Sequence, residues 1–178
     1  MRSSLKIAAA LLSGIASTST WAQSPVDNAE IRHGRYLVQT AGCNDCHTPG
    51  YMQQDGKVAE SEWLTGDSIG WQGPWGTTYP ANLRLLFQQM DEKTWLARAR
   101  LPMRPPMPSP SLRAMSDADL RAIYRYARSL GAKGAPVPAY VPPGGKVATP
   151  YFDFTPKNLP PKNRPALAGK QPELPAQH

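Results

Sequence analysis

Three side chains that react with metals or with unsaturated carbon lie close together: Cys43, Cys46 and His47. They form the pattern C-x-x-C-H, in which two thiols add to the two vinyl groups of a porphyrin and the histidine binds the iron from one side. The short gap lets both sulfurs reach the same edge of the macrocycle. The motif therefore predicts one covalently attached c-type haem, with His47 as an iron ligand. A C-x-x-C redox or zinc motif followed by a chance histidine is the alternative.

An iron held by one histidine takes a second axial ligand or stays open to water and small molecules. A methionine closes the site and raises the reduction potential. With the initiator Met1 set aside, the candidates are Met52, Met90, Met103, Met107 and Met115. Histidine ligation would need His33, which is expected on a helix, or His178, the last residue of the chain. At this point a methionine, a second histidine and an open site all remain possible.

The first 22 residues have the composition of a secretory signal peptide. Arg2 and Lys6 precede an apolar run, and small residues lead to a cleavage site after Ala22. The apolar run is too short to span a bilayer, which argues against a retained anchor. We therefore expect export, to the periplasm in a Gram-negative host. Thioether bonds to haem would use both cysteines and leave none for a disulfide.

The charge of the chain excludes one broad class of function. The whole chain carries +7, and removal of Arg2 and Lys6 leaves +5. Residues 135–178 contribute +3 of this, so the part with the motif is only mildly basic. No basic stripe with interleaved aromatic residues is present, so nucleic-acid binding is not indicated. A mild positive charge suits docking to an acidic redox partner.

Four stretches have helical patterns: 27–41, 82–89, 91–100 and 116–130. Gly34 lies inside the first, where glycine costs about 1 kcal/mol relative to alanine, so we expect another helix to pack closely against it. The third has acidic residues at its start and basic residues at its end, and we expect Arg98 and Arg100 to be solvated.

The last predicted helix has the clearest signals. Ser116 followed by Asp119 resembles a capping box, in which each end of the pair satisfies a backbone N–H. An apolar stripe with the spacing i, i+3, i+4, i+7 comprises Leu120, Ile123, Tyr124 and Ala127. Arg121, Arg125 and Arg128 occupy the opposite face. The helix is therefore expected to bury one side against the domain.

Residues 63–80 are rich in tryptophan and glycine and follow neither a helix nor a strand period. Trp63, Trp71 and Trp75 nevertheless carry a large apolar surface. We expect an irregular loop that wraps a porphyrin, or alternatively a small core that covers the helices.

Prolines divide the rest of the chain. Five of them, between Pro102 and Pro110, are expected to exclude regular helix around Met103 and Met107. Residues 135–178 hold eleven of the twenty prolines. Within them, 137–154 is expected to lie on the surface as an extended strap, and the chain beyond about Thr155 to be loosely packed. The expected organisation is a leader over 1–22, a haem domain over 23–134 and a proline-rich tail over 135–178.

The order of these features resembles a class I cytochrome c, most closely the monohaem cytochromes that serve bacterial periplasmic dehydrogenases. The resemblance covers 27–131: G-x-Y-L, G-C-x-x-C-H, a Trp/Gly loop, M-P, and a helix with S-D-x-D-L-x-x-I-Y-x-Y. It implies an all-α fold of three to five short helices around one haem c. It does not extend to the proline-rich tail.

The resemblance also implies roles for single residues. In that family the ligand methionine precedes an aromatic of the last helix by just under twenty residues, and Met107 precedes Tyr126 by 19. Met107 is thus the preferred distal ligand and Met103 its main rival. A proline carbonyl accepts a hydrogen bond from the proximal histidine, which makes Pro80 a candidate. The candidates for holding the haem propionates are Trp63, Trp71, Trp75 and Arg84.

The implied function is one-electron transfer, with redox proteins such as a periplasmic dehydrogenase, an oxidase or another cytochrome as partners and no acid–base catalysis. Two alternatives stay open. A haem enzyme or gas sensor would have an open distal site. A haem-bearing subunit of a larger dehydrogenase complex would use the proline-rich tail for attachment.

Overall fold

The computed structural model describes residues 25–159. The predicted leader and the last part of the predicted tail lie outside the described residues. Within them the chain is mostly helical, as predicted, with six α-helices rather than three to five: α1 Pro25–Thr40, α2 Cys43–His47, α3 Leu83–Gln89, α4 Glu92–Ala99, α5 Ser109–Ala114 and α6 Asp117–Ser129. None of these helices has the length and apolar character needed to cross a membrane.

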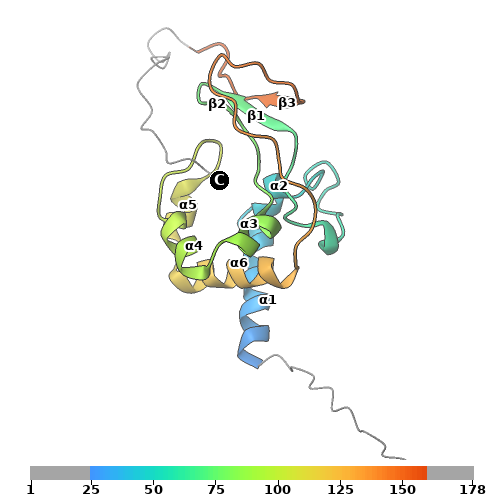
Figure 1. Ribbon diagram of the computed structural model, residues 1–178, viewed down its shortest axis with the longest axis vertical. Helices are drawn as coiled ribbons and strands as arrows, with labels where there is room; N and C mark the ends of the chain where they lie inside the picture. The colour runs from blue at the N-terminus through green and yellow to red at the C-terminus, as the bar shows by residue number, and fades with distance from the viewer. Residues whose placement is uncertain (1–24, 160–178) are drawn as a thin grey trace, which may run out of the picture.

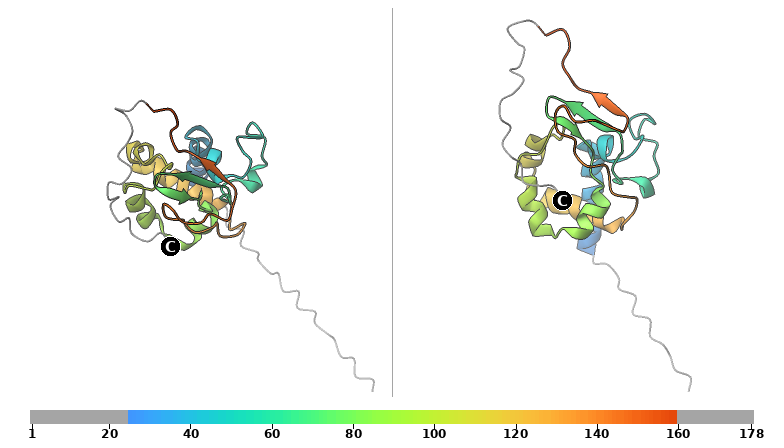
Figure 2. Two further views of the ribbon diagram at one scale, coloured as in Figure 1. Left: turned by 90° about the horizontal axis from the view of Figure 1, so that it is seen from above. Right: turned by 45° about the horizontal axis from the view of Figure 1, so that its top comes forward.

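The helices α1 and α6 cross and form the base of the molecule (Figure 1). Gly34 lies at the crossing, where a Cβ atom would stand 2.0 Å from the carbonyl oxygen of Ala122 and 2.7 Å from Cβ of Tyr126. The close approach predicted from a glycine inside a helix is therefore confirmed. Figure 2 shows the same crossing from two other directions.

The helix α6 is defined by its cap and its apolar face. The Ser116 hydroxyl accepts a hydrogen bond from the Asp119 N–H at 3.1 Å, and the Asp119 carboxylate accepts one from the Ser116 N–H at 3.1 Å. The predicted capping box is thus present. All members of the predicted stripe are buried: Leu120, Ile123, Tyr124 and Ala127.

The helices α3 and α4 form one wall above α6. Asn82 caps α3 and Asp91 caps α4, each by accepting a backbone N–H. Phe87 packs edge-on against Trp95 and Tyr124, with ring centroids 4.8 and 5.3 Å apart. The indole N–H of Trp95 donates to the carbonyl of Leu120, which joins this wall to α6.

The expectation that prolines exclude regular helix up to Pro110 is wrong at its end. Pro110 lies in the first turn of α5. Backbone N–H groups in the first turn make no hydrogen bond within the helix, so proline loses none there, and its fixed φ suits the helix. The segment before it, 101–108, contains no helix or strand. This segment, which carries Met103 and Met107, is called the methionine loop below.

The Trp/Gly stretch is irregular over 63–69, as predicted, but not in the part that follows. It forms the hairpin strands β1 (Gly70–Gly73) and β2 (Gly76–Thr78), which pair antiparallel with Trp71 opposite Thr78. A third strand, β3 (Tyr151–Asp153), pairs parallel to β1 and gives the order β2-β1-β3. The expectation of a purely helical fold is corrected to this extent. Figure 1 places the sheet at the end of the molecule away from α6.

The strap, residues 137–154, lies on the domain as predicted. Val141 exchanges backbone hydrogen bonds with Thr77 at 2.8 and 3.0 Å. Farther along, Phe154 stacks on Trp71 with ring centroids 5.0 Å apart. Tyr79 and Thr149 are joined by a hydroxyl hydrogen bond of 2.7 Å. The strap thus covers the hairpin along most of its length.

Candidate functional site

The reactive motif lies on the short helix α2, which begins directly after a sharp turn. Gly42 adopts a φ of 74°, in the left-handed region that favours glycine, and so lets α1 end and α2 start in a new direction. Cys43 and Cys46 are both partly buried and have free thiols. Burial raises the pKa of the Cys43 thiol to about 11, so the sulfur stays protonated at neutral pH.

His47 is buried and its ring is fixed. Its side chain donates from Nδ1 to the carbonyl oxygen of Ala81 at 2.7 Å, because a carbonyl can only accept. Burial lowers the pKa of His47, so the imidazole is neutral and Nε2 keeps its lone pair. An imidazole held in this way is a ready metal ligand.

The acceptor for His47 differs by one position from the expectation. Pro80 was the candidate by resemblance, but the carbonyl that His47 reaches belongs to Ala81. The turn here has one residue more than the family pattern, and this shifts the accepting carbonyl forward along the chain. A backbone carbonyl therefore accepts the hydrogen bond from His47, but it is that of Ala81.

Both cysteines and His47 line one cavity, whose empty volume is about 1070 Å³ with the open space at its mouth included. Its walls come from the hairpin, α3, α4, α5, α6 and the methionine loop. Its apolar lining includes Trp71, Leu83, Leu86, Phe87, Trp95, Leu112 and Ile123. The chain thus forms a large apolar cavity with two thiols and an imidazole in its wall.

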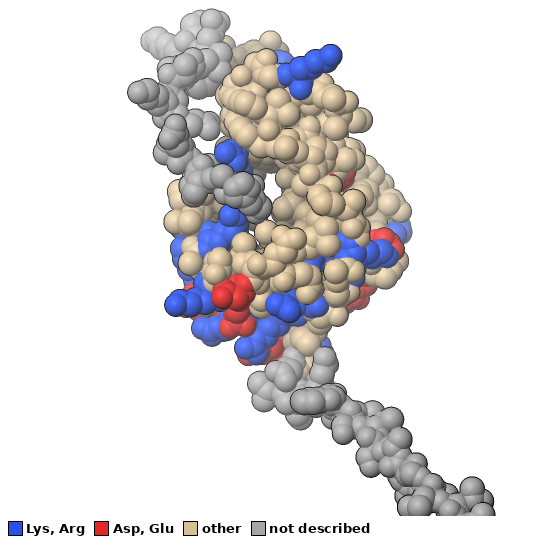
Figure 3. Space-filling model, viewed as in Figure 1, with Lys and Arg blue, Asp and Glu red and all other residues tan. Residues whose placement is uncertain are grey.

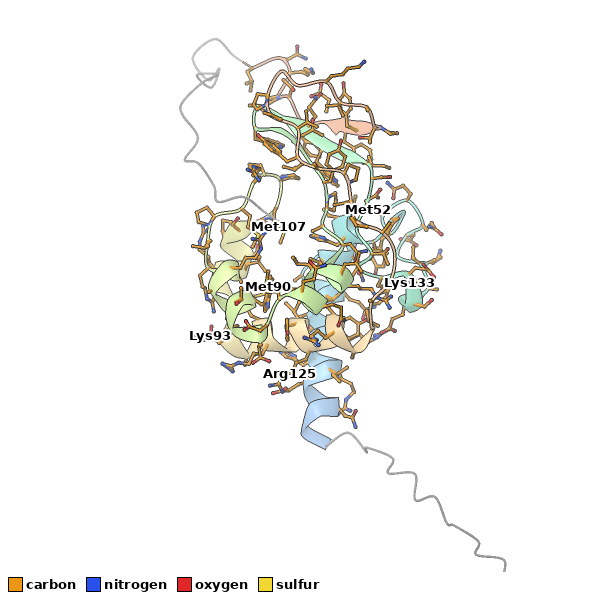
Figure 4. All side chains as sticks on the ribbon, viewed as in Figure 1. Met52, Met90, Lys93, Met107, Arg125 and Lys133 are labelled. Atoms are coloured by element: carbon orange, nitrogen blue, oxygen red, sulfur yellow. The ribbon has the colours of Figure 1, made fainter. Side chains whose placement is uncertain are left out.

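The methionines separate into two groups. Met103 and Met107 line the cavity, and both come from the methionine loop. Met90 and Met115 pack against the hydrophobic core, and Met52 is 48% exposed. Figure 4 shows Met90 at the end of α3 and Met107 just before α5. The structure therefore brings the preferred methionine and its main rival to the same cavity.

Two arginines also line the cavity, and the sequence interpretation missed both. Arg98 was expected to be solvated, but it is half-buried in the cavity wall, and burial lowers its pKa. Arg104 belongs to the methionine loop. No ion pair to either guanidinium is found within residues 25–159. A signal was available, because Arg98 falls three residues after the inward-facing Trp95 on the same helix.

Three of the four residues proposed for the propionates have other partners. The indole N–H of Trp63 donates to Val58, and that of Trp75 donates to Trp71. Arg84 is 5% exposed and donates to the carbonyls of Ser61, Leu130 and Gly131. Only Trp71 of the four lines the cavity. The expectation is therefore wrong for Trp63, Trp75 and Arg84, whose donors are used inside the fold.

Among the residues that the structure describes, no second histidine lines the cavity. His33 lies on the exposed side of α1, where its Nε2 is 2.8 Å from the Asp119 carboxylate. It is absent from the cavity lining. His178 lies outside the described residues. In this part of the chain, His47 is the one histidine at the cavity.

A sequence model of the cytochrome c family matches residues 31–131. The fructose dehydrogenase cytochrome subunit of Gluconobacter japonicus is 37% identical over 115 residues, which cover 60% of this chain. The match spans only 23% of that subunit. No solved structure matches the chain.

Proposed function

Because the chain belongs to the cytochrome c family, its cofactor is covalently bound haem c, and we propose that it is an exported one-electron carrier with a His/Met-ligated iron. The observation that carries the proposal is the cavity itself: two thiols, a neutral imidazole and two thioether side chains face one apolar space. This donor set matches the needs of a porphyrin with two vinyl groups and an iron.

The chain's own residues fit the cofactor at each of its parts. Haem c, when bound, supplies an iron that takes up and gives off one electron. The thiols of Cys43 and Cys46 would form the thioether links, and Nε2 of His47 would bind the iron. The hydrogen bond from Nδ1 to Ala81 fixes the imidazole ring and raises its basicity. The apolar wall excludes water from the space between these groups.

Met107 is proposed as the distal ligand. Its place in the cavity and its spacing to Tyr126 both support the assignment. Met103 shares the cavity but lacks the spacing. A thioether ligand would close the iron to small molecules and raise the reduction potential, as suits a carrier rather than a haem enzyme.

Arg98 is proposed to hold a haem propionate. A half-buried guanidinium without an ion pair among the described residues is costly, and a carboxylate of the cofactor would pair with it. Trp71, which also lines the cavity, is the second candidate donor.

The proposed partner is an exported dehydrogenase, from which the chain would receive electrons and pass them toward the respiratory chain. Support comes from the similarity to a dehydrogenase cytochrome subunit. The predicted leader supports export. The haem motif supports it as well, because covalent haem attachment takes place outside the cytoplasmic membrane. The proposal names the class of partner, a dehydrogenase, and does not name the substrate that this dehydrogenase oxidises.

A redox titration of the purified holoprotein tests the proposal. We expect a single one-electron wave, a low-spin spectrum in both oxidation states, and little reaction of the ferrous form with carbon monoxide. A high-spin ferric spectrum with rapid carbon monoxide binding would contradict the carrier function and favour an open-site haem enzyme.

A second candidate is a haem-bearing subunit held in a larger dehydrogenase complex. The observation that favours it is that the match covers a fraction of a dehydrogenase subunit. Size-exclusion chromatography of the full chain with and without residues 160–178 distinguishes the two. A carrier runs as a monomer in both forms and is reduced equally fast by the dehydrogenase, whereas an attached subunit loses its association with the dehydrogenase when residues 160–178 are removed.

A further inference from the structure

The methionine loop, residues 101–108, is held at its tip by residues from the sheet end of the molecule. The Thr78 hydroxyl donates to the carbonyl of Pro105 at 2.8 Å. The guanidinium of Arg104 lies over the ring of Tyr140, 4.1 Å from its centroid. Arg104 directly follows Met103 and precedes Met107 by three residues. The strap therefore reaches the loop between its two methionines.

Tyr140 itself is firmly placed. Its hydroxyl donates to the carbonyl of Trp75 at 2.7 Å. The next residue, Val141, is paired with Thr77 in both directions. Gly76 permits this close packing, because a Cβ there would stand 2.3 Å from the carbonyl oxygen of Val141. A ring fixed at both its hydroxyl and its backbone can hold Arg104 in place.

The loop has few hydrogen bonds of its own that could replace these, although Met103 and Met107 pack against the hydrophobic core. Its prolines cannot donate backbone hydrogen bonds. The bonds that remain are short-range. Leu101 N–H donates to Arg98, Met107 N–H to Arg104, and the other bonds join the loop to the start of α5. These shape the loop but do not attach its tip to the hairpin. The tip therefore depends on Thr78 and Tyr140 for its attachment.

We propose that Tyr140, which lies outside the part of the chain that matches the cytochrome c family, is a positioning residue for the distal methionine. By holding Arg104 it keeps the methionine loop closed over the cavity and sets how firmly the thioether stays on the iron. The inference rests on the proposed function, because it concerns the methionine ligand.

Imidazole binding to the ferric holoprotein at neutral pH tests this role. In the exchange, the imidazole nitrogen replaces the methionine sulfur on the iron, and no electron is transferred. Tyr140→Leu removes the cation–π contact, so the loop opens more often and imidazole should bind about 2–10-fold more tightly. The weak far-red absorption band of the Fe–S(Met) bond reports the same exchange spectroscopically, without an activity assay.

Two matched variants separate the ring from other effects. Tyr140→Phe keeps the ring over Arg104 and loses only the hydroxyl, so it should change the imidazole affinity less than Tyr140→Leu. Tyr151→Leu alters a strap tyrosine that is exposed and makes no ring contact, and it should behave as the wild type. If Tyr140→Leu binds imidazole like Tyr151→Leu, the proposal is overturned.

Arg104→Gln removes the other partner of the Arg104–Tyr140 contact. This variant replaces Tyr140→Leu in the test if Tyr140→Leu does not fold. It should tighten imidazole binding by a similar factor, and the double variant should add little, because one contact is lost in each case. Independent, multiplying effects would overturn the proposal, as would a wild-type affinity for Arg104→Gln. A wild-type protein without the far-red band would instead overturn methionine ligation and, with it, both proposals.

Discussion

Which atoms of a residue can bind the cofactor depends on which of its hydrogen-bonding groups are already used by neighbouring carbonyls. The His47 ring keeps Nε2 free because Ala81 occupies Nδ1. Trp63, Trp75 and Arg84 are excluded as cofactor ligands because backbone carbonyls already use their donors. The motif C-x-x-C-H predicted the reactive residues from the sequence alone. The partners of the other donors could not be predicted, because they depend on which carbonyls a helix end or a turn leaves unpaired.

Replacement of Arg98 by glutamine should lower the reduction potential. A positive charge near the iron favours the ferrous state, whose net charge is lower. Two unit charges about 10 Å apart interact by roughly 1–2 kcal/mol at an effective dielectric constant of about 20, which corresponds to tens of millivolts. Arg98→Lys keeps the charge and should shift the potential less. A redox titration in which Arg98→Gln matches the exposed-site control Arg32→Gln would count against the propionate assignment.

Arg84 should be essential for stability although it lies away from the cavity. Its guanidinium satisfies the carbonyls at the end of α6, and burial lowers its pKa without removing its charge. Arg84→Leu takes the donor from three part-buried carbonyl hydrogen bonds and should cost roughly 2–5 kcal/mol of unfolding free energy in a urea titration. Arg100 also donates to carbonyls at a helix end, but its side chain is 35% exposed. Arg100→Leu should therefore cost less, and an equal loss would contradict this account.

At the scale of elements, the long amphipathic helices were predictable and the short ones less so. The cap and stripe of α6 are local in sequence, and the structure confirms them. The helix α5 was missed because Pro110 was treated as a helix breaker, whereas its position in the first turn makes it compatible with a helix. The hairpin was missed because its glycines hide the strand alternation.

The crossing of α1 and α6 should not tolerate a side chain at position 34. Gly34→Ala puts a methyl group against the backbone of Ala122, and neither helix can move without disturbing the core. We expect a loss of about 3 kcal/mol in unfolding free energy. Arg32→Ala changes an exposed position of the same helix and should have little effect. Equal stability of the two variants would show that the helices are farther apart than the structure has them.

The cap of α6 should make stability depend on pH in the acid range. The hydrogen bonds from His33 and Ser116 lower the pKa of Asp119. A lowered pKa in the folded state stabilises the protein above the ordinary value of about 3.9, and this contribution is lost as the pH falls through the lowered value. Asp119→Asn should therefore be about 1 kcal/mol less stable than the wild type at pH 7, with a smaller difference near pH 3.

The comparison is made by urea unfolding at both pH values, with Asp55→Asn as the control. Asp55 is 90% exposed, and its replacement should change little at either pH. A difference between the wild type and Asp119→Asn that stays constant from pH 7 to pH 3 would contradict the assigned role.

At the scale of the whole molecule, the helical part and the sheet differ in surface chemistry. In the view of Figure 3, the charged side chains gather over the helices, while the part formed by the hairpin and the strap is largely uncharged. Exposed aromatic side chains of the strap, Phe152 and Phe154, pack against Trp71 at this end. The sequence predicted a strap but not its pairing with β1, because strand pairing between distant segments leaves no local signal.

The most direct test of the central claim is the optical spectrum of the ferric holoprotein in three forms: the wild type, Met107→Ala and Met103→Ala. His/Met ligation predicts the weak far-red band of the Fe–S(Met) bond in the wild type. It also predicts that Met107→Ala loses the band and becomes high-spin or open to added ligands, whereas Met103→Ala keeps it. A wild-type spectrum without the band, or its loss in Met103→Ala alone, would contradict the assignment of Met107.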